Sequence, residues 1–193
     1  MAAMSHCFGI DYDGTLADTS LMKARWIREH LGRDMPAWQC DRTSCVPIIG
    51  AEHYKAMANV VYEQEWSMQA PAVAGALDAV KALSTRGKVY VVSARLPHRM
   101  AFARKWLEQR GVVRLVSGFL SSAGSDKEAL CMQYGLQVLI DDDARHLEGL
   151  PPERIMPILL KPGLQGELYV PAGVALCRSW GEVLSMIGLS AQD

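Results

Sequence analysis

The chain has 193 residues, half of them hydrophobic, and a formal net charge of −1 at pH 7. This length suits one domain, or a core domain with a modest insertion, and the apolar content excludes a disordered chain. The basic residues form no run typical of a nucleic-acid arm, and no apolar stretch reaches the roughly 18 residues that span a bilayer, so we expect neither nucleic acid nor a membrane as a partner.

The amino-terminal stretch "MAAMSHCFGI" lacks the basic region, apolar core and cleavage site of a secretory signal, so we expect a cytoplasmic protein. It leads into the first predicted strand, "HCFGID", residues 6–11, which ends in two carboxylates one residue apart. The chain has five cysteines and no CxxC motif. Free thiols are therefore expected rather than disulfides or a zinc site.

The segment from residue 17 to residue 70 is helical in pattern and rich in aromatic residues: Trp26, Trp38, Tyr54, Tyr62 and Trp66. Because it separates the first strand from the next helix, we predict an inserted helical cap at 17–70 and a core domain at 1–16 and 71–193. The stretch "GRDMPAWQCDRTSCVPIIG" divides this cap into at least two helical pieces. The aromatic side chains either pack a small helical core or stack on a base or sugar of a substrate.

The rest of the chain alternates between helical and strand-like periodicity. Helices are predicted at 71–87, 98–111, 125–135 and 179–188, and strands at 88–94, 112–120, 137–143, 154–160 and 174–177. Ser125 and Glu128 have the spacing of a capping box for the third of these helices. The alternation predicts an α/β, Rossmann-like fold with a mainly parallel sheet flanked by helices and a small helical cap inserted after the first strand.

Polar side chains follow four of the predicted strands, where ligands bind in open parallel sheets. They are Asp11 and Asp13 after the first strand, Ser93 after the second, Lys127 after the third, and Asp141, Asp142 and Asp143 after the fourth. Carboxylates gathered at one edge repel each other and resist leaving water. Such a cluster indicates a bound cation.

The motif "DYDGTLADT" resembles the first signature of the haloacid dehalogenase superfamily of phosphotransferases, Asp-x-Asp-Gly-Thr at the end of the first strand. The segment "VVSA", the residue Lys127 and the segment "LIDDD" resemble its second, third and fourth signatures, in the expected order. The resemblance covers residues 8–143. The "LIDD" form and the compact cap are similar to 5′-nucleotidase or phosphoglycolate phosphatase-like members.

This resemblance implies that Asp11 is the nucleophile, which forms an aspartyl-phosphate. Asp13 acts as general acid for the leaving oxygen and then as base for the hydrolytic water. The family's Mg²⁺ is held by the Asp11 carboxylate, the backbone carbonyl of Asp13 and one acid of the fourth signature, here Asp141 or Asp142.

The resemblance also implies that Ser93 and Lys127 bind the phosphoryl oxygens. Backbone amides of the turn through Gly14 and Thr15 add to this phosphate site if they point inward. Gly14 suits a turn that needs a positive φ, and the Thr15 hydroxyl could support the loop. The four acids at Asp11, Asp13, Asp141 and Asp142 outnumber Lys127, which agrees with a divalent cation among them.

We therefore expect Mg²⁺-dependent hydrolysis of a small phosphorylated metabolite, with a nucleoside monophosphate as the first candidate and phosphoglycolate-like or sugar phosphates next. The alternatives are a phosphomutase, a nucleic-acid 3′-phosphatase and a non-catalytic interaction protein on the same fold. The last would be expected to lose Asp11 or Asp13, and both are present.

Four other polar residues near the motifs have more ordinary interpretations. Asp143 suits the cap of a following helix better than a metal ligand. Arg95 reaches phosphate or substrate, or else is solvated. His98 and His146 are expected at the surface or at a helix end.

Overall fold

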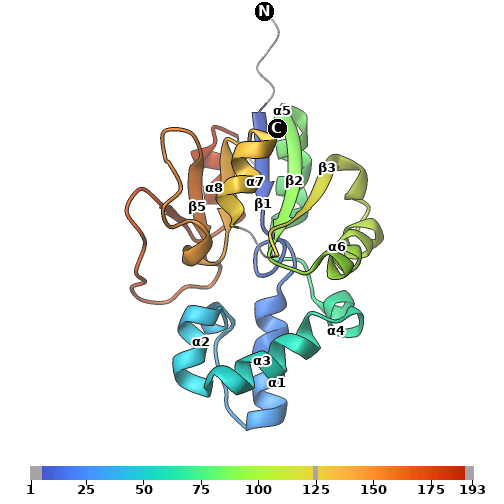
Figure 1. The fold of residues 1–193 in the computed structure, drawn as a ribbon, viewed down its shortest axis with the longest axis vertical. Coiled ribbons are helices and arrows are strands. Elements are labelled where there is room, and N and C mark those ends of the chain that lie inside the picture. The colour runs from blue at the N-terminus through green and yellow to red at the C-terminus, as the bar shows by residue number, and fades with distance from the viewer. Residues whose placement is uncertain (1–5, 124–125, 190–193) are drawn as a thin grey trace, which may run out of the picture.

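The computed structural model describes residues 6–123 and 126–189 and contains a six-stranded sheet in the order β3-β2-β1-β4-β5-β6 (Figure 1). Every neighbouring pair of strands is parallel. The strands are β1 (His6–Ile10), β2 (Gly87–Ser93), β3 (Val116–Ser121), β4 (Val138–Asp141), β5 (Met156–Leu160) and β6 (Ala175–Cys177). The predicted α/β, Rossmann-like sheet is confirmed.

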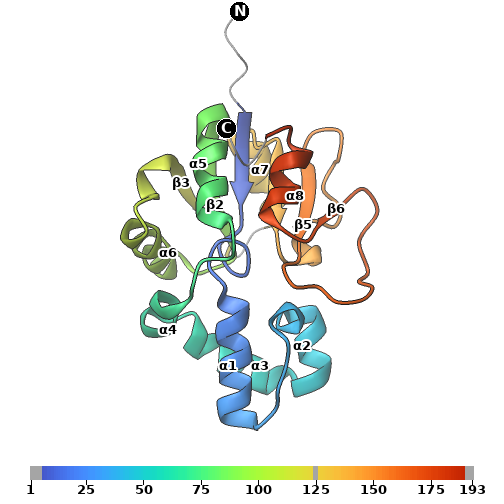
Figure 2. The ribbon, with the colours of Figure 1, turned by 180° about the vertical axis from the view of Figure 1, so that it is seen from behind.

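Helices cover both faces of this sheet. They are α5 (Ala76–Arg86), α6 (Pro97–Gln109), α7 (Lys127–Tyr134) and α8 (Trp180–Met186). Short 3₁₀ turns occur in the loops of this core at η2 (Val113–Leu115) and η3 (Ala144–His146), and a third, η1 (Ala37–Gln39), lies in the segment between β1 and α5. α5 and α8 lie on one face and α7 on the other (Figures 1 and 2). Alternate strand residues serve the two faces, since Val91 and Ile140 pack in one apolar cluster and Val92 and Leu139 in the other.

Each predicted strand and helix of this core is present, with shifted ends. The predicted strand at 112–120 opens as the 3₁₀ turn η2 before it becomes β3. The predicted capping box is wrong, because Asp126 is the N-cap of α7 and accepts a hydrogen bond from the backbone N–H of Ala129 at 2.8 Å. Ser125 lies outside the described residues. An aspartate directly before the helix satisfies the first-turn donors that the serine was expected to satisfy.

The chain between β1 and α5 forms four helices, which we call the cap helices: α1 (Thr19–Leu31), α2 (Arg42–Ile49), α3 (Ala51–Val61) and α4 (Gln64–Gln69). They lie beyond the carboxyl ends of the strands (Figure 1). The chain enters and leaves them side by side, because Asp18 N–H donates to Pro71 O at 2.8 Å and Val73 N–H donates to Leu16 O at 2.9 Å. The division at residues 17 and 70 into cap and core stays a prediction.

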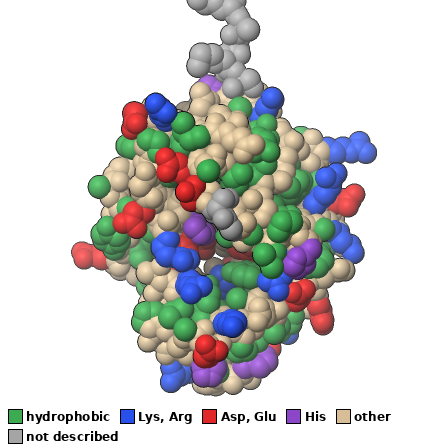
Figure 3. Space-filling view, viewed as in Figure 1, with side chains coloured by type: hydrophobic (Ala, Val, Ile, Leu, Met, Phe, Trp, Pro, Cys, Tyr) green, Lys and Arg blue, Asp and Glu red, His purple; other side chains and the backbone are tan. Residues whose placement is uncertain are grey.

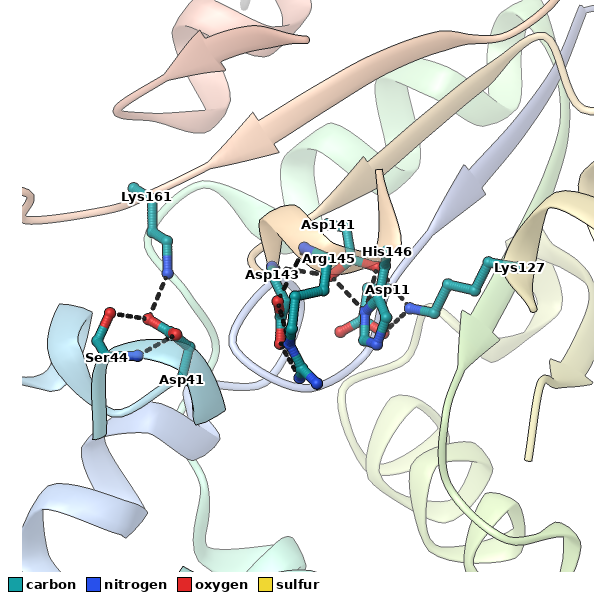
Figure 4. Close-up of polar contacts among 9 residues, drawn as sticks. All are labelled: Asp11, Asp41, Ser44, Lys127, Asp141, Asp143, Arg145, His146 and Lys161. Atoms are coloured by element: carbon teal, nitrogen blue, oxygen red, sulfur yellow. Dashed lines mark hydrogen bonds and ion pairs between the residues drawn. The ribbon is translucent and has the colours of Figure 1, made fainter. Parts of the chain in front are cut away.

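Polar contacts join the cap helices to the residues around the sheet. Lys161, just after β5, contacts Asp41, the N-cap of α2, at 2.9 Å, and both side chains are buried (Figure 4). The Trp106 indole N–H on α6 donates to Ala70 O at 2.8 Å, and Arg99 forms an ion pair with Glu63. These contacts hold the cap helices over the strand ends.

The aromatic residues of the cap helices have divided roles. Trp26 is buried in the apolar core, and Trp38 and Trp66 are half-buried. Tyr54 and Tyr62 also pack in or against this core, and in addition they line a cleft between the cap helices and the strand ends. All five cysteines are free, as expected. No helix within residues 6–123 and 126–189 has the length and apolarity required to cross a bilayer.

Candidate active site

The register of the parallel strands brings the predicted signature residues to one edge of the sheet. Ile10 is paired with Val91 on one side and with Ile140 on the other. The chain then continues in register, because Asp11 N–H donates to Ile140 O at 2.8 Å. Asp11 and Asp141, 130 residues apart, therefore end neighbouring strands at the same level.

Lys127 lies at the centre of this edge. Its Nζ is 2.5 Å from Asp11 Oδ1, 2.5 Å from Asp141 Oδ2 and 3.3 Å from Val92 O (Figure 4). Burial lowers the pKa of Lys127, but the Asp11 and Asp141 carboxylates raise it by more, so that it lies above its ordinary value. The ammonium group is therefore charged and shared between two acids that come from different strands.

The acids around Lys127 are not equally compensated. Although burial raises the pKa of Asp141, Lys127 and His146 lower it by more, so Asp141 is ionised. Burial raises the pKa of Asp11 well above its ordinary value against the opposing effect of Lys127. Burial also raises the pKa of Asp142 to about 7. Asp11 and Asp142 thus lack a cation sufficient to keep them ionised.

Asp11, Asp141 and Asp142 form a donor set that fits a hard divalent cation. Each offers a carboxylate oxygen, and these oxygens lie within 4.8 Å of one another. Asp141 already accepts hydrogen bonds from the backbone N–H of Asp143 at 2.9 Å and from Lys127. Asp11 and Asp142 are consequently the two acids with the most coordination capacity left. Buried carboxylate oxygens with raised pKa values are what a magnesium ion would stabilise.

Asp13 is held by Arg95 rather than by the acid cluster. The guanidinium donates from Nε to Asp13 Oδ2 and from Nη2 to Asp13 Oδ1, both at 2.8 Å. The guanidinium carbon of Arg95, Cζ, lies 4.7 Å from the centre of the Tyr12 ring and 5.1 Å from the centre of the Tyr62 ring. Although burial raises the pKa of Asp13, Arg95 lowers it by more. The interpretation of Arg95 as a solvated side chain is therefore wrong.

In the turn after β1, Gly14 lies directly against the carboxylate of Asp142. Its φ is +81°, and a Cβ at this position would lie 2.2 Å from Asp142 Oδ2. Thr15 is fully buried, and its backbone oxygen accepts a hydrogen bond from the Trp180 indole N–H at 3.1 Å. Thr15 does not line the cleft that contains Asp11. The structure thus brings Gly14 against a candidate metal ligand and leaves Thr15 in a supporting position within the fold.

Replacing Gly14 by Ala is expected to weaken both folding and metal binding. The left-handed backbone alone costs a β-carbon about 1–2 kcal/mol, and the clash with Asp142 would move that carboxylate. Gly32→Ala is the matched control, because Gly32 has φ +61° and no atom within 4 Å of an added Cβ. Urea unfolding should show a loss for both variants, whereas titration calorimetry with Mg²⁺ should show weaker binding for Gly14→Ala alone. Equal Mg²⁺ affinities would contradict this prediction.

The acids open into a cleft of about 370 Å³ between the strand ends and the cap helices. Ser93, the last residue of β2, lines it, and its Oγ accepts a hydrogen bond from the Arg95 N–H at 3.2 Å. Lys23 of α1, Tyr54 of α3 and Tyr62, the residue that follows α3, also line it. Lysine and arginine side chains gather around the hollow at the centre of the face in Figure 3. The cleft is therefore acidic at its floor and basic around its mouth.

Sequence reasoning missed two residues of this site. His146 is the last residue of η3, a helix end as expected, but its partner was missed: its Nδ1 lies 3.1 Å from Asp141 Oδ2. It reaches this position because Asp143 caps η3, as predicted, and turns the chain back toward β4. Lys23 was not considered, although a lysine three residues before Trp26 lies on the buried face of α1. A charge at helical spacing on an apolar face was the available signal.

Comparison with known proteins identifies the fold. No family model and no curated protein matches the sequence. A haloacid dehalogenase-like family hydrolase from Streptococcus pneumoniae is 17% identical, with a TM-score of 0.65 over 97% of this chain and 100% of that one. A predicted phosphoglycolate phosphatase from Haemophilus somnus is 13% identical, with a TM-score of 0.63 over 97% and 100%.

A third solved structure, the putative haloacid dehalogenase hydrolase YfnB from Bacillus subtilis bound to magnesium, is 11% identical, with a TM-score of 0.61 over 96% of this chain and 99% of that one. The chain therefore has the fold of the haloacid dehalogenase-like hydrolases over nearly its whole length. The predicted superfamily fold is confirmed, and the finer likeness to 5′-nucleotidases stays a prediction.

Proposed function

We propose that the chain is a Mg²⁺-dependent phosphomonoester hydrolase that forms an aspartyl-phosphate on Asp11. The observation that carries this proposal is the meeting of Asp11, Lys127, Asp141 and Asp142 at the strand ends. Of these, Asp11 and Asp142 line the cleft, as does Asp13. The likeness in fold to hydrolases, including a magnesium-bound one and a predicted phosphoglycolate phosphatase, supports it.

In this reaction an Asp11 carboxylate oxygen attacks phosphorus, and the bond from phosphorus to the ester oxygen breaks. Lys127 orients Asp11 through the 2.5 Å contact to Oδ1. We propose that Lys127 and the Ser93 hydroxyl, of which Ser93 lines the cleft, bind the phosphoryl oxygens. Asp11 and Asp142, with Asp141 beside them, would hold the ion. Bound Mg²⁺ supplies positive charge that keeps these acids ionised and offsets the charge of the phosphoryl group.

Asp13 is proposed to move the protons. It lies on the same cleft as Asp11, so it can donate a proton to the leaving alkoxide and then accept one from the water that cleaves the aspartyl-phosphate. The ion pair with Arg95 keeps Asp13 ionised in the structure without substrate, which suits the second step. For the first step Arg95 would release Asp13 when the phosphate ester enters, since its guanidinium also matches phosphate geometry. The released carboxylate would take up a proton from the monoanionic form of the ester or from solvent water, and this is the proton that it donates to the leaving alkoxide.

The substrate is proposed to be a small phosphorylated metabolite. Asp11 is only 4% exposed, and the cap helices stand over the strand ends, so a macromolecular phosphate would have to displace them. Nucleoside monophosphates and phosphoglycolate-like esters are the candidates from the sequence, and the cytoplasmic location also stays a prediction. Cap helices held over the cleft would exclude water from the phosphoryl-transfer step.

The first test is hydrolysis of p-nitrophenyl phosphate and of a panel of phosphorylated metabolites with Mg²⁺ and with EDTA. We expect release of inorganic phosphate with Mg²⁺, loss of this activity in EDTA because the acid cluster is then uncompensated, and recovery when Mg²⁺ is added in excess. An unchanged rate after chelation would contradict the metal assignment, and no phosphate release from any ester would contradict the proposed activity.

A further inference from the structure

Lys23 is a buried cation of the cleft that lacks an acidic partner. Lys23 is 4% exposed. Its side chain extends from α1 into the cleft that Asp11 and Asp13 also line. Of the four arginines that line the cleft, three form ion pairs: Arg95 with Asp13, Arg99 with Glu63 and Arg145 with Asp143. The fourth, Arg42, forms no ion pair within the described residues but is exposed to solvent, whereas Lys23 is buried. Within residues 6–123 and 126–189, no ion pair of Lys23 is present.

Lys23 nevertheless keeps its charge. Burial lowers its pKa, but the surrounding Tyr62, Tyr54, Asp142 and Asp13 raise it by more, so that it lies well above the ordinary value. The two carboxylates act from beyond ion-pair distance. A buried ammonium group without a direct counter-ion is unfavourable unless an anion binds there. The part of the cleft around the Lys23 ammonium group therefore suits a bound anion.

The tyrosines beside Lys23 are occupied by cations. The Lys23 Nζ lies 5.5 Å from the centre of the Tyr62 ring, which Arg95 also approaches at 5.1 Å. Arg42 lies 6.0 Å from the centre of the Tyr54 ring. Lys23 and Arg42 therefore bring two cations without ion pairs, within the described residues, to this end of the cleft. Their positive charge favours an anionic group there.

We propose that Lys23 binds a second anionic group, a carboxylate or a phosphate, on the leaving group of the phosphate ester. This inference rests on the proposed function and narrows its substrate class to small esters that carry two acidic groups. The cleft of about 370 Å³ extends from Asp11 and Ser93 at the strand ends to Lys23 and Tyr54 on the cap helices. Such a substrate thus has its phosphoryl group at the acid cluster and its second anion at Lys23.

The test compares two matched pairs of esters on the wild-type enzyme. Phosphoglycolate is paired with its neutral amide, and propane-1,3-diol bisphosphate is paired with 3-hydroxypropyl phosphate. The first pair probes a carboxylate and the second a phosphate. We expect a higher kcat/KM for the doubly anionic member of at least one pair, and the pair that shows it identifies the chemistry of the second group.

Lys23→Met keeps an unbranched side chain that is one atom shorter and removes its charge. For the preferred ester it should lower kcat/KM roughly 10- to 100-fold, chiefly through KM, as expected for one charge-assisted hydrogen bond, and leave the neutral partner nearly unchanged. Lys23→Arg should retain much of the preference. Lys55→Met is the matched control, since Lys55 is exposed on α3 and does not line the cleft.

The outcomes separate this inference from the function on which it rests. Hydrolysis of both members of each pair at equal kcat/KM would overturn the inference and leave the phosphatase in place. An equal loss on charged and neutral esters in Lys23→Met would also overturn it, because Lys23 would then only balance Asp13 and Asp142. No hydrolysis of any ester would overturn the proposed function itself.

Discussion

Replacing Asp11 by Asn is expected to abolish turnover of p-nitrophenyl phosphate while the protein stays folded. The carboxamide has nearly the shape of the carboxylate but is not a nucleophile, so no aspartyl-phosphate forms. Loss of a catalytic nucleophile lowers kcat by at least on the order of 10⁴-fold in well-studied hydrolases. Phosphate release at saturating substrate is the measurement.

The stability of Asp11→Asn should equal or exceed that of the wild type at pH 7 without metal. Because burial and its acidic neighbours raise the pKa of Asp11 in the folded state, its ionised form is disfavoured by folding, and a neutral amide removes that cost. Lys127 keeps Asp141 and Val92 O as partners. Urea unfolding measures this directly.

Asp34→Asn is the matched control for this prediction, since Asp34 is exposed and should tolerate the same change without effect. An Asp11→Asn variant that turns over at a rate near that of the wild type would count decisively against the assignment of the nucleophile. A variant that is inactive but unfolded would be uninformative by activity alone, so the unfolding curve and the rate are read together.

Replacing Lys127 by Met is expected to remove both activity and a large part of the stability. Lys127 is the shared partner of Asp11 and Asp141, and its side chain is 1% exposed. Removing one partner of a buried ion pair typically destabilises by about 3–5 kcal/mol, because the remaining charge is left uncompensated. The loss should appear as a lower urea midpoint at pH 7, together with loss of phosphate release.

The stability difference between wild type and Lys127→Met should depend on pH in a defined direction. In the wild type the pKa of Asp141 is lowered by folding, so its contribution is present above about pH 4 and is lost as the pH falls through the folded value. The pKa of Lys127 is raised by folding, so its contribution is present below about pH 10 and is lost as the pH rises. The difference should be largest near neutral pH.

Lys105→Met controls for the loss of a lysine, since Lys105 is exposed on α6 and its removal should change stability by less than about 0.5 kcal/mol. A Lys127→Met protein as stable at pH 7 as this control would contradict the buried ion-pair arrangement. A difference that failed to shrink at acidic pH would contradict the role of Asp141 in it.

The sequence by itself determined the order of the elements and the identity of the reacting groups. The alternation of apolar strands and amphipathic helices requires a parallel sheet, and parallel strands bring their carboxyl ends to one edge. Asp11, Ser93 and Asp141 lie at those ends, so the periodicity of the sequence predicts that they come close together. The role of Lys127 was predicted from the order of the signature motifs along the chain. These features are set by neighbouring residues along the chain and by the geometry of the strand.

The tertiary structure alone decided the partners of the charged side chains. Arg95 reaches Asp13 across 82 positions, and nothing in the sequence around either residue distinguishes that pairing from a solvated arginine. The burial of Lys23 in the cleft likewise depends on how α1 packs against the other cap helices. His146 faces Asp141 only because η3 turns the chain back.

The physical reason is that a periodic pattern fixes which face of an element is buried but not which groups meet across the space between elements. That meeting depends on strand register, helix placement and the balance between desolvation and charge pairing. The contact between Gly14 and Asp142 is one example. The sequence predicts a turn with a positive φ at Gly14, but only the packing of the two strand ends brings this turn against the Asp142 carboxylate.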